Sequence, residues 1–265
     1  MKFRLLLLIS MIFLLLISCK ENRHKYEIEE RKEYSDTIET EETVREISQT
    51  IEPPELTDNW NAGEIISPRE VREVGIENCF EILNINDEIF RRINGHSYKE
   101  NAGINLEDLR YLKLIHHDLS GNIKKGELIC NKKIATDLYE IFLNLYNADY
   151  PISSIRLIDE FDADDIKSMQ ANNTSCFNYR TTVGGSKISK HGKGLAIDLN
   201  PLFNPYIKLN SGKVLPPEGE FYTNREEDFP YKIDRNDLAY KEFTKRGFKW
   251  GGDWRTVKDY QHFEK

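Results

Sequence analysis

The sequence predicts a single α+β domain, with a small antiparallel sheet flanked by helices, over residues 61–265. The chain has 265 residues, of which 39% are hydrophobic, and this is enough for one ordinary core. A pattern with helical spacing at 133–146 stands among several short apolar runs that are typical of strands. No internal repeat is present. Helices and strands mixed in this way indicate an α+β domain with an antiparallel sheet.

The first nineteen residues predict the signal peptide of a lipoprotein. Lys2 and Arg4 precede an almost wholly apolar run, Leu5–Ser18, which is too short for a membrane span of about 20 residues but suits a signal-peptide core. The run ends in Leu-Ile-Ser-Cys, which resembles a bacterial lipobox and implies cleavage before Cys19 and lipidation of its thiol. We therefore expect a cell-envelope protein, lipid-anchored on the periplasmic or outer-membrane face. The alternative is a plain signal peptide with an accidental cysteine.

Residues 20–60 predict a disordered acidic tether. Between residues 20 and 58 there are 13 acidic and 6 basic side chains, only two aromatic ones, and the pair Pro53-Pro54. So few apolar groups with so much net charge cannot offset the entropy of an ordered chain. Most of the net charge of -8 therefore belongs to the tether. A negative chain also argues against a nucleic-acid partner, because phosphate binding requires an excess of Lys and Arg.

The first half of the domain contains one clear element. Residues 77–93 indicate several short elements, and 106–119 mixes helix and strand signals. Residues 133–146 carry apolar side chains at the spacing of an amphipathic helix. A short strand is expected at 154–158.

The second half is expected to alternate strands, a loop and a helix. Residues 195–199, Leu-Ala-Ile-Asp-Leu, predict a buried strand, and 202–220 predicts a loop because it is rich in Pro, Asn and Gly. A helix is expected over 237–246, ended by Gly247 in the left-handed conformation common after a helix. Residues 248–263 are expected to form a strand, a turn and a strand.

Three cysteines remain after Cys19. Because Cys79, Cys130 and Cys176 are odd in number, at most one disulfide can form within the chain. Cys130 lies in an apolar stretch and is expected to be a buried small side chain. No Cys-x-x-Cys spacing exists, which excludes a zinc site of paired thiolates.

Two segments far apart in the sequence hold the residues suited to chemistry. The first is Ser189–Asp198 and the second is Asp259–Glu264. His191 lies between residues that let a loop bend sharply, and Asp198 is a carboxylate in an otherwise apolar strand, where a buried charge requires a partner or a metal. With His262 these make two imidazoles and one carboxylate, the set found in catalytic zinc sites that leave a fourth position open.

Each of these residues also has a simpler explanation. A histidine in a glycine-rich loop is usually solvated, and an aspartate in a strand is usually satisfied by backbone amides. The residues alone therefore leave the zinc site open. Glu264 is expected to lie beside the site or at the surface. The other histidines are expected to take no part, since they lie outside the two segments: His24, His96, His116 and His117.

The pattern Ser-x-His-x-x-Gly-x-Ala-x-Asp, followed by an acidic residue three positions before a C-terminal His, resembles the D-alanyl-D-alanine carboxypeptidase family of zinc metallopeptidases. Three further segments resemble its branch of phage endolysins that cut L-Ala-D-Glu bonds: Asn172–Arg180, Asp198–Tyr206 and Gly247–Trp254. The resemblance covers roughly residues 110–265. It implies a fold like that of these peptidases and of the related hedgehog domains.

The resemblance also implies roles for single residues. His191, Asp198 and His262 fall on the ligands of one zinc ion. Asp259 falls on the catalytic acid and base, and Arg180 on the arginine that polarises the scissile carbonyl and steadies the oxyanion. Other positions are expected to surround these groups: Ser189 as a hydrogen-bonding neighbour of the first ligand, and Tyr206 and Trp254 as cleft residues, with plain core packing as their alternative.

The sequence therefore predicts a monomeric zinc peptidase that cuts bonds next to D-amino acids in peptidoglycan stem peptides. The alternative is a catalytically silent lipoprotein that uses its zinc site only to bind peptidoglycan or protein, as hedgehog domains signal by binding. Asp259 favours the enzyme, because a binder has no need of a base. Endopeptidase and carboxypeptidase activity both remain open. A carboxypeptidase would require a grip on a terminal carboxylate, for which Arg156 or Lys193 are candidates.

Overall fold

The computed structural model describes residues 60–100, 103–181 and 187–265. The expected signal peptide with Cys19, His24 and almost the whole of the expected tether lie outside the described residues. Among the helices within the described ranges, none has the length and apolar character needed to span a membrane.

The described chain opens with small elements that lie against a central sheet: α2 (Pro68–Val74), η1 (Ile76–Cys79), β1 (Glu81–Leu83), α3 (Asp87–Ile93) and η2 (Leu106–Asp108). Helix α2 begins at a reciprocal cap, because the Ser67 hydroxyl accepts from the backbone N–H of Glu70 while the Glu70 carboxylate accepts from that of Ser67. Asn86 caps α3 with a single bond, because its side-chain oxygen accepts from the backbone N–H of Ile89.

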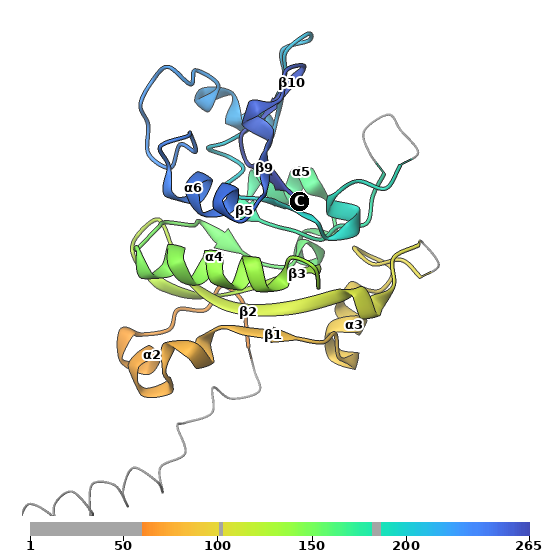
Figure 1. Ribbon diagram of the computed structural model, residues 1–265, viewed down its shortest axis with the longest axis vertical. Helices are drawn as coiled ribbons and strands as arrows, with labels where there is room; N and C mark the ends of the chain where they lie inside the picture. Colours follow the sequence, from red (N-terminus) through yellow and green to blue (C-terminus); the bar gives the residue numbers. More distant parts are fainter. Residues whose placement is uncertain (1–59, 101–102, 182–186) are drawn as a thin grey trace, which may run out of the picture. The chain divides into compact units, whose positions relative to one another are not determined.

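Two long antiparallel strands form the centre of the domain. Strand β2 (Leu109–His117) pairs along its whole length with β3 (Ile123–Asn131), and β1 pairs with the free edge of β2. Helix α4 (Ala135–Asn147) covers one face of this sheet and buries Leu138, Ile141, Phe142 and Leu145. Figure 1 shows α4 between the long strands and the C-terminal elements. The predicted helix at 133–146 is confirmed.

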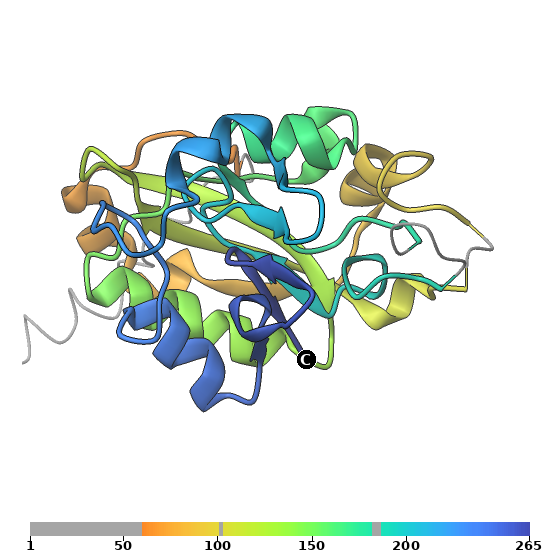
Figure 2. The ribbon, with the colours of Figure 1, turned by 90° about the horizontal axis from the view of Figure 1, so that it is seen from above.

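The rest of the chain is built from short elements: β4 (Ser154–Ile155), η3 (Ile158–Phe161), α5 (Asp165–Gln170), β5 (Asn173–Thr174), η4 (His191–Lys193), β6 (Ala196–Asp198), β7 (Tyr206–Lys208), β8 (Lys213–Leu215), η5 (Pro217–Tyr222), α6 (Leu238–Lys245), β9 (Lys249–Trp250), η6 (Gly251–Asp253), β10 (Val257–Asp259) and β11 (His262–Glu264). They make two further antiparallel sheets, in the orders β6-β11-β9 and β10-β7-β8, and one parallel pair, β4-β5. Figure 2 shows α6 beside α4, against which it packs.

The fold is therefore a mixed α+β arrangement, as the sequence predicts, but the single small sheet is a wrong expectation. The structure has several small sheets. Residues 202–220, expected as a loop, contain the hairpin β7–β8 and the turn η5. Strands of three residues are too short to show an alternating pattern, so Pro, Asn and Gly between them dominate the sequence signal. The segment 154–158 forms a strand only at its first two residues.

The remaining expectations for the C-terminal half are met more closely. Strand β6 lies within the predicted buried strand, and α6 begins directly after Asp237, whose carboxylate caps it by accepting from two backbone N–H groups. Gly247 has φ +83°, the left-handed conformation expected of it. Residues 248–263 form three strands, β9, β10 and the start of β11, where two were expected.

Aromatic packing fixes the last strand in the core. Phe263 is fully buried, and its ring stacks on that of Phe243 with centroids 4.4 Å apart. Since side chains alternate along a strand, burying Phe263 on this side turns the neighbours His262 and Glu264 to the other face of β11. Cys79, Cys130 and Cys176 are free and buried, so no disulfide forms among them.

Candidate metal centre

Three elements bring His191, Asp198 and His262 together. Asp198 ends β6 and His262 begins β11, and these antiparallel strands pair so that the two residues stand directly opposite each other. Opposite side chains on one face of an antiparallel pair are close enough to contact. His191 arrives from the short turn η4, and its side chain is buried.

The three ligand atoms form a nearly equilateral triangle. Nε2 of His191 lies 3.1 Å from Nδ1 of His262 and 3.2 Å from Oδ1 of Asp198, and the last two atoms lie 3.0 Å apart. Around a tetrahedral zinc ion with bonds of about 2.0–2.1 Å, neighbouring ligand atoms stand about 3.3 Å apart. The three side chains thus form a group that can hold one metal ion, and a small outward shift would fit zinc.

The other ring nitrogens have fixed partners. Nδ1 of His191 donates to the backbone carbonyl of Cys176 at 2.7 Å, and Nε2 of His262 lies 3.3 Å from the Glu264 carboxylate. A hydrogen bond of this kind fixes the tautomer and the ring orientation of a histidine ligand. In each ring, the nitrogen that faces Asp198 is therefore the one left with a lone pair for a metal.

The charge of Asp198 suits a ligand. Burial by itself would raise the pKa of Asp198, but the neighbouring His191 and His262 hold it well below its usual range. The carboxyl group is therefore ionised at neutral pH, which is the form that binds a metal.

The turn that carries His191 depends on its neighbours. The Ser189 hydroxyl accepts from the backbone N–H of Gly192 at 2.9 Å, so Ser189 stabilises the turn and makes no direct bond to a ligand. A Cβ on Gly192 would lie 2.8 Å from the carbonyl oxygen of Arg180, closer than real contacts allow. Glycine is therefore required where the turn that carries His191 crosses the segment that carries Arg180.

Asp259 lies beside the triangle on a different sheet. It ends β10 directly opposite Tyr206 of β7, and its Oδ1 accepts from Nε2 of Gln261 at 3.2 Å. Burial raises the pKa of Asp259 to about 6; the charge of His262 opposes this shift and that of Asp198 adds to it. A carboxyl group with such a pKa exchanges protons near neutral pH, as a general base requires.

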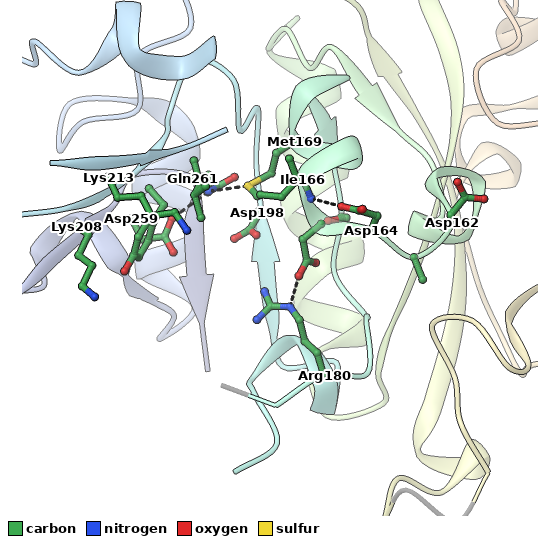
Figure 3. Close-up of a pocket in the computed structure, with 15 residues that line it drawn as sticks. Asp162, Asp164, Ile166, Met169, Arg180, Asp198, Lys208, Lys213, Asp259 and Gln261 are labelled. Carbon is green, nitrogen blue, oxygen red and sulfur yellow. Dashed lines mark hydrogen bonds and ion pairs between the residues drawn. The ribbon is translucent and has the colours of Figure 1, made fainter. Parts of the chain in front are cut away.

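A cleft of about 680 Å³ lies next to Asp198 and Asp259. Asp198, Asp259 and Gln261 lie in its wall, and Figure 3 shows Asp198 in the middle with Asp259 and Gln261 to one side. Arg180 also lines the cleft, and its Nε forms an ion pair with Oδ2 of Asp165 at 2.5 Å. Figure 3 shows the guanidinium group directed toward the region of Asp198.

The two aromatic residues named from the sequence lie in different places. Tyr206 lines the cleft, opposite Asp259. Trp254 packs instead against a ligand, its ring centroid 5.1 Å from that of His262, and it is not among the residues that line the cleft. The expectation of a cleft residue therefore fits Tyr206 and not Trp254.

The other histidines of the described residues lie away from the candidate metal centre. His116 is buried in β2, and His117 pairs with Asp149 and stacks on Tyr146. His96 is exposed in a turn after α3. None of them belongs to the metal-binding group found among the described residues.

The cationic candidates named for a carboxylate grip lie outside the cleft. Arg156 forms an ion pair with Glu160, and Lys193 is exposed; neither lines the cleft. The cleft contains Lys208 and Lys213 instead. The signal that would have found them is the Asn-Ser-Gly turn between the two lysines, which favours a hairpin.

Gln261 is a second residue that the sequence analysis missed. It is 2% exposed, and its Oε1 has no hydrogen-bond partner among the described residues. An unpaired buried acceptor in a cleft is costly unless a ligand satisfies it. Its position between Asp259 and His262 in the sequence was the available signal.

The family comparison agrees with this centre. Residues 183–265 match the family model described as D-alanyl-D-alanine carboxypeptidase. The match covers less than half of the chain and includes the three ligands and Asp259, while Arg180 precedes it. The C-terminal part of the chain is thus similar to this family over the stretch that holds the proposed ligands. No curated protein and no solved structure matches the chain.

Proposed function

We propose that the protein is a monomeric zinc peptidase of the bacterial cell envelope that hydrolyses bonds next to D-amino acids in peptidoglycan stem peptides. The observation that carries the proposal is the triangle of His191, Asp198 and His262, in which Asp198 lines a cleft that Asp259 also lines. Two histidines and one carboxylate with an open side are the ligand set of zinc peptidases.

The reaction divides among a few side chains. Zinc bound by the triangle would polarise the scissile carbonyl and lower the pKa of a water molecule toward neutrality. Asp259 takes a proton from the attacking water, and Arg180 donates hydrogen bonds to the carbonyl oxygen as negative charge develops on it. Asp259 then gives the proton to the departing amine nitrogen. Its raised pKa suits both transfers.

A binding module is the rival proposal, and the environment of Asp259 favours the enzyme. A buried carboxyl group costs stability, and the raised pKa of Asp259 records that cost. A module that only holds peptide gains nothing from such a group, whereas a hydrolase requires it as a proton acceptor.

The proposal is tested on purified muropeptides. Wild-type protein is expected to release a peptide or amino-acid fragment, a chelator should stop the release, and added zinc should restore it. Asp259→Ala should lose activity by about 10²–10⁴-fold while elemental analysis still finds one zinc per chain. Full activity in the chelator, or in Asp259→Ala, would contradict the proposed mechanism.

The bond that is cut follows from the product masses. A carboxypeptidase releases one D-amino acid from the end of the stem peptide, whereas an endopeptidase acting at L-Ala-D-Glu releases a longer peptide. The endolysin-like segments of the sequence favour the endopeptidase. Mass spectrometry of a digest of defined muropeptides separates the two.

The membrane anchor is part of the proposal and rests on the sequence alone. Lipidation of Cys19 would attach the domain to a membrane, and residues 20–60 would let it reach the wall. In detergent phase partitioning, wild-type protein is expected in the detergent phase and the Cys19→Ala protein in the aqueous phase. Equal partitioning of the two would contradict a lipid on Cys19.

A further inference from the structure

One face of the sheet β10-β7-β8 forms a wall of the cleft. Tyr206 and Leu215 stand opposite each other on the hairpin, and Lys208 and Lys213 form the next pair on the same face. All four line the cleft, while the residues between them in each strand do not. Asp259 is opposite Tyr206 and belongs to the first row. The lysines therefore stand about 6.6–6.8 Å behind the row that contains Asp259.

The two lysines make an unusual pair. Like charges directly opposite each other on a sheet destabilise it. Within the described ranges, neither ammonium group has a carboxylate or other hydrogen-bond partner, and both side chains are exposed. The sheet therefore carries two unneutralised positive charges on the one face that is turned to the cleft.

Charge is separated along the cleft. Figure 3 shows Lys208 and Lys213 on the side of Asp259, and Asp162 and Asp164 on the far side of Asp198. The carboxylates at the far end have partners already, because Asp162 pairs with Lys167 and Asp164 caps α5. Only the end with the lysines is left with unpaired charge among the described residues.

The proposed reaction determines which side of the scissile bond lies at the end of the cleft that contains the lysines. Asp259 must reach the departing nitrogen, because it returns the proton to that atom, so the amine side of the scissile bond lies toward Asp259. Arg180 serves the carbonyl oxygen from another wall. The residue that follows the scissile bond would thus lie over β7 and β8, beside two lysine side chains with flexible four-carbon stems.

We infer that Lys208 and Lys213 form a subsite for a carboxylate carried by the residue on the amine side of the cleaved bond. The inference rests on the proposed peptidase function and adds its substrate class. A terminal D-amino acid offers its α-carboxylate there, and a γ-linked D-Glu offers its free α-carboxylate. The subsite therefore selects stem peptides with a free acid at this position and discriminates against those with an amide.

Binding of matched peptides tests the subsite without turnover. The full chain carrying Asp259→Ala is titrated with diacetyl-L-Lys-D-Ala-D-Ala and its C-terminal carboxamide. A second arm uses L-Ala-γ-D-Glu-L-Lys and its D-isoglutamine counterpart. In at least one arm the acid is expected to bind at least tenfold more tightly than the amide. The arm that discriminates identifies the source of the carboxylate.

The lysines are then replaced in the same background. In Lys208→Gln/Lys213→Gln the ratio of the two affinities should fall below threefold, through weaker binding of the acid and unchanged binding of the amide. Lys245→Gln removes an exposed lysine of α6, away from the cleft, and should keep the wild-type ratio. Equal binding of acid and amide in both arms, or a ratio that persists without the lysines, overturns the inference.

Kinetics separate this inference from the proposed function. With Asp259 intact, kcat/KM for the acid should fall at least tenfold in the double lysine variant, and that for the amide should change little. A wild-type protein that binds the acids through the lysines but releases no product would refute the peptidase and leave the subsite standing.

Discussion

The carboxylate of Glu264 lies 3.3 Å from Nε2 of His262, on the side of the ring away from the nitrogen that faces Asp198. His262 is therefore held between two carboxylates, one of them a proposed ligand of the metal. A carboxylate behind a histidine ligand fixes the ring and increases its basicity.

Removing this second carboxylate should weaken the metal centre without removing a ligand. Glu264→Ala is expected to reduce zinc affinity about 10–100-fold, and Glu264→Gln less, because the amide oxygen can still accept from Nε2–H. Competition with a chromophoric chelator measures the affinity. Glu226→Gln, an exposed glutamate, is the control. Unchanged affinity in Glu264→Ala would exclude this role.

A buried ion pair attaches the N-terminal elements to the central sheet. Arg92 of α3 makes two bonds to the carboxylate of Glu127 on β3, which also accepts from the Tyr111 hydroxyl at 2.6 Å. The Glu127 side chain is only 1% exposed. Its charge thus depends on these two partners from neighbouring elements.

Breaking this pair should cost much of the stability of the domain. Arg92→Met leaves the Glu127 carboxylate buried without its cation, and is expected to lower the free energy of unfolding by about 3–5 kcal/mol. Urea denaturation measures the change. The neighbouring Arg91→Met, which loses only a bond to a backbone carbonyl of its own helix, should change stability by less than about 1 kcal/mol. Equal effects of the two variants would show that the pair contributes little.

The cap of α6 predicts a pH dependence of stability. Burial raises the pKa of Asp237 to about 6, although two backbone N–H groups and the Tyr150 hydroxyl oppose the shift. The folded protein therefore binds this proton more tightly than the unfolded chain does. The stabilising contribution is complete below the unfolded pKa of about 3.9, and it is lost as the pH rises through 6.

Asp237→Asn isolates this titration, since asparagine caps a helix equally well but carries no charge. The free energy of unfolding of wild type minus that of the variant should fall by about 2–3 kcal/mol between pH 4 and pH 7, since one pKa unit corresponds to about 1.4 kcal/mol. Urea titrations at several pH values give both curves. Parallel curves would contradict a raised pKa at Asp237.

The sequence predicts the centre well because its residues lie in two compact segments. The family resemblance marks His191, Asp198 and Asp259 by the spacing within these segments, and the structure adds that β6 and β11 pair and so bring Asp198 opposite His262. The helix at 133–146 is equally clear because its apolar side chains form one stripe over four turns. Such features depend on neighbours in the chain, which a sequence displays directly.

What could not be predicted depends on contacts between distant residues. The partner of Arg92 is 35 residues away, and no local pattern marks Glu127 as buried. Lys208 and Lys213 resemble ordinary solvated lysines until the hairpin places both beside the cleft. Trp254 is of a residue type that often lines clefts, yet its ring packs on that of His262. Only the fold decides between these two positions.

Arg180 provides the sharpest test of the reaction, because it lies in the cleft but is not among the proposed ligands. Loss of a donor to a developing oxyanion typically costs about 10²–10³ in kcat. Arg180→Met is therefore expected to lower kcat by this factor with a smaller change in KM, and to leave zinc content and thermal stability near those of wild type. Arg180→Lys should recover part of kcat, since the charge remains without the planar pair of donors.

Arg255→Met, at an exposed arginine, is the matched control. If Arg180→Met instead raised KM at unchanged kcat, the guanidinium would bind substrate and transition state equally, and the oxyanion would have to be stabilised by another group.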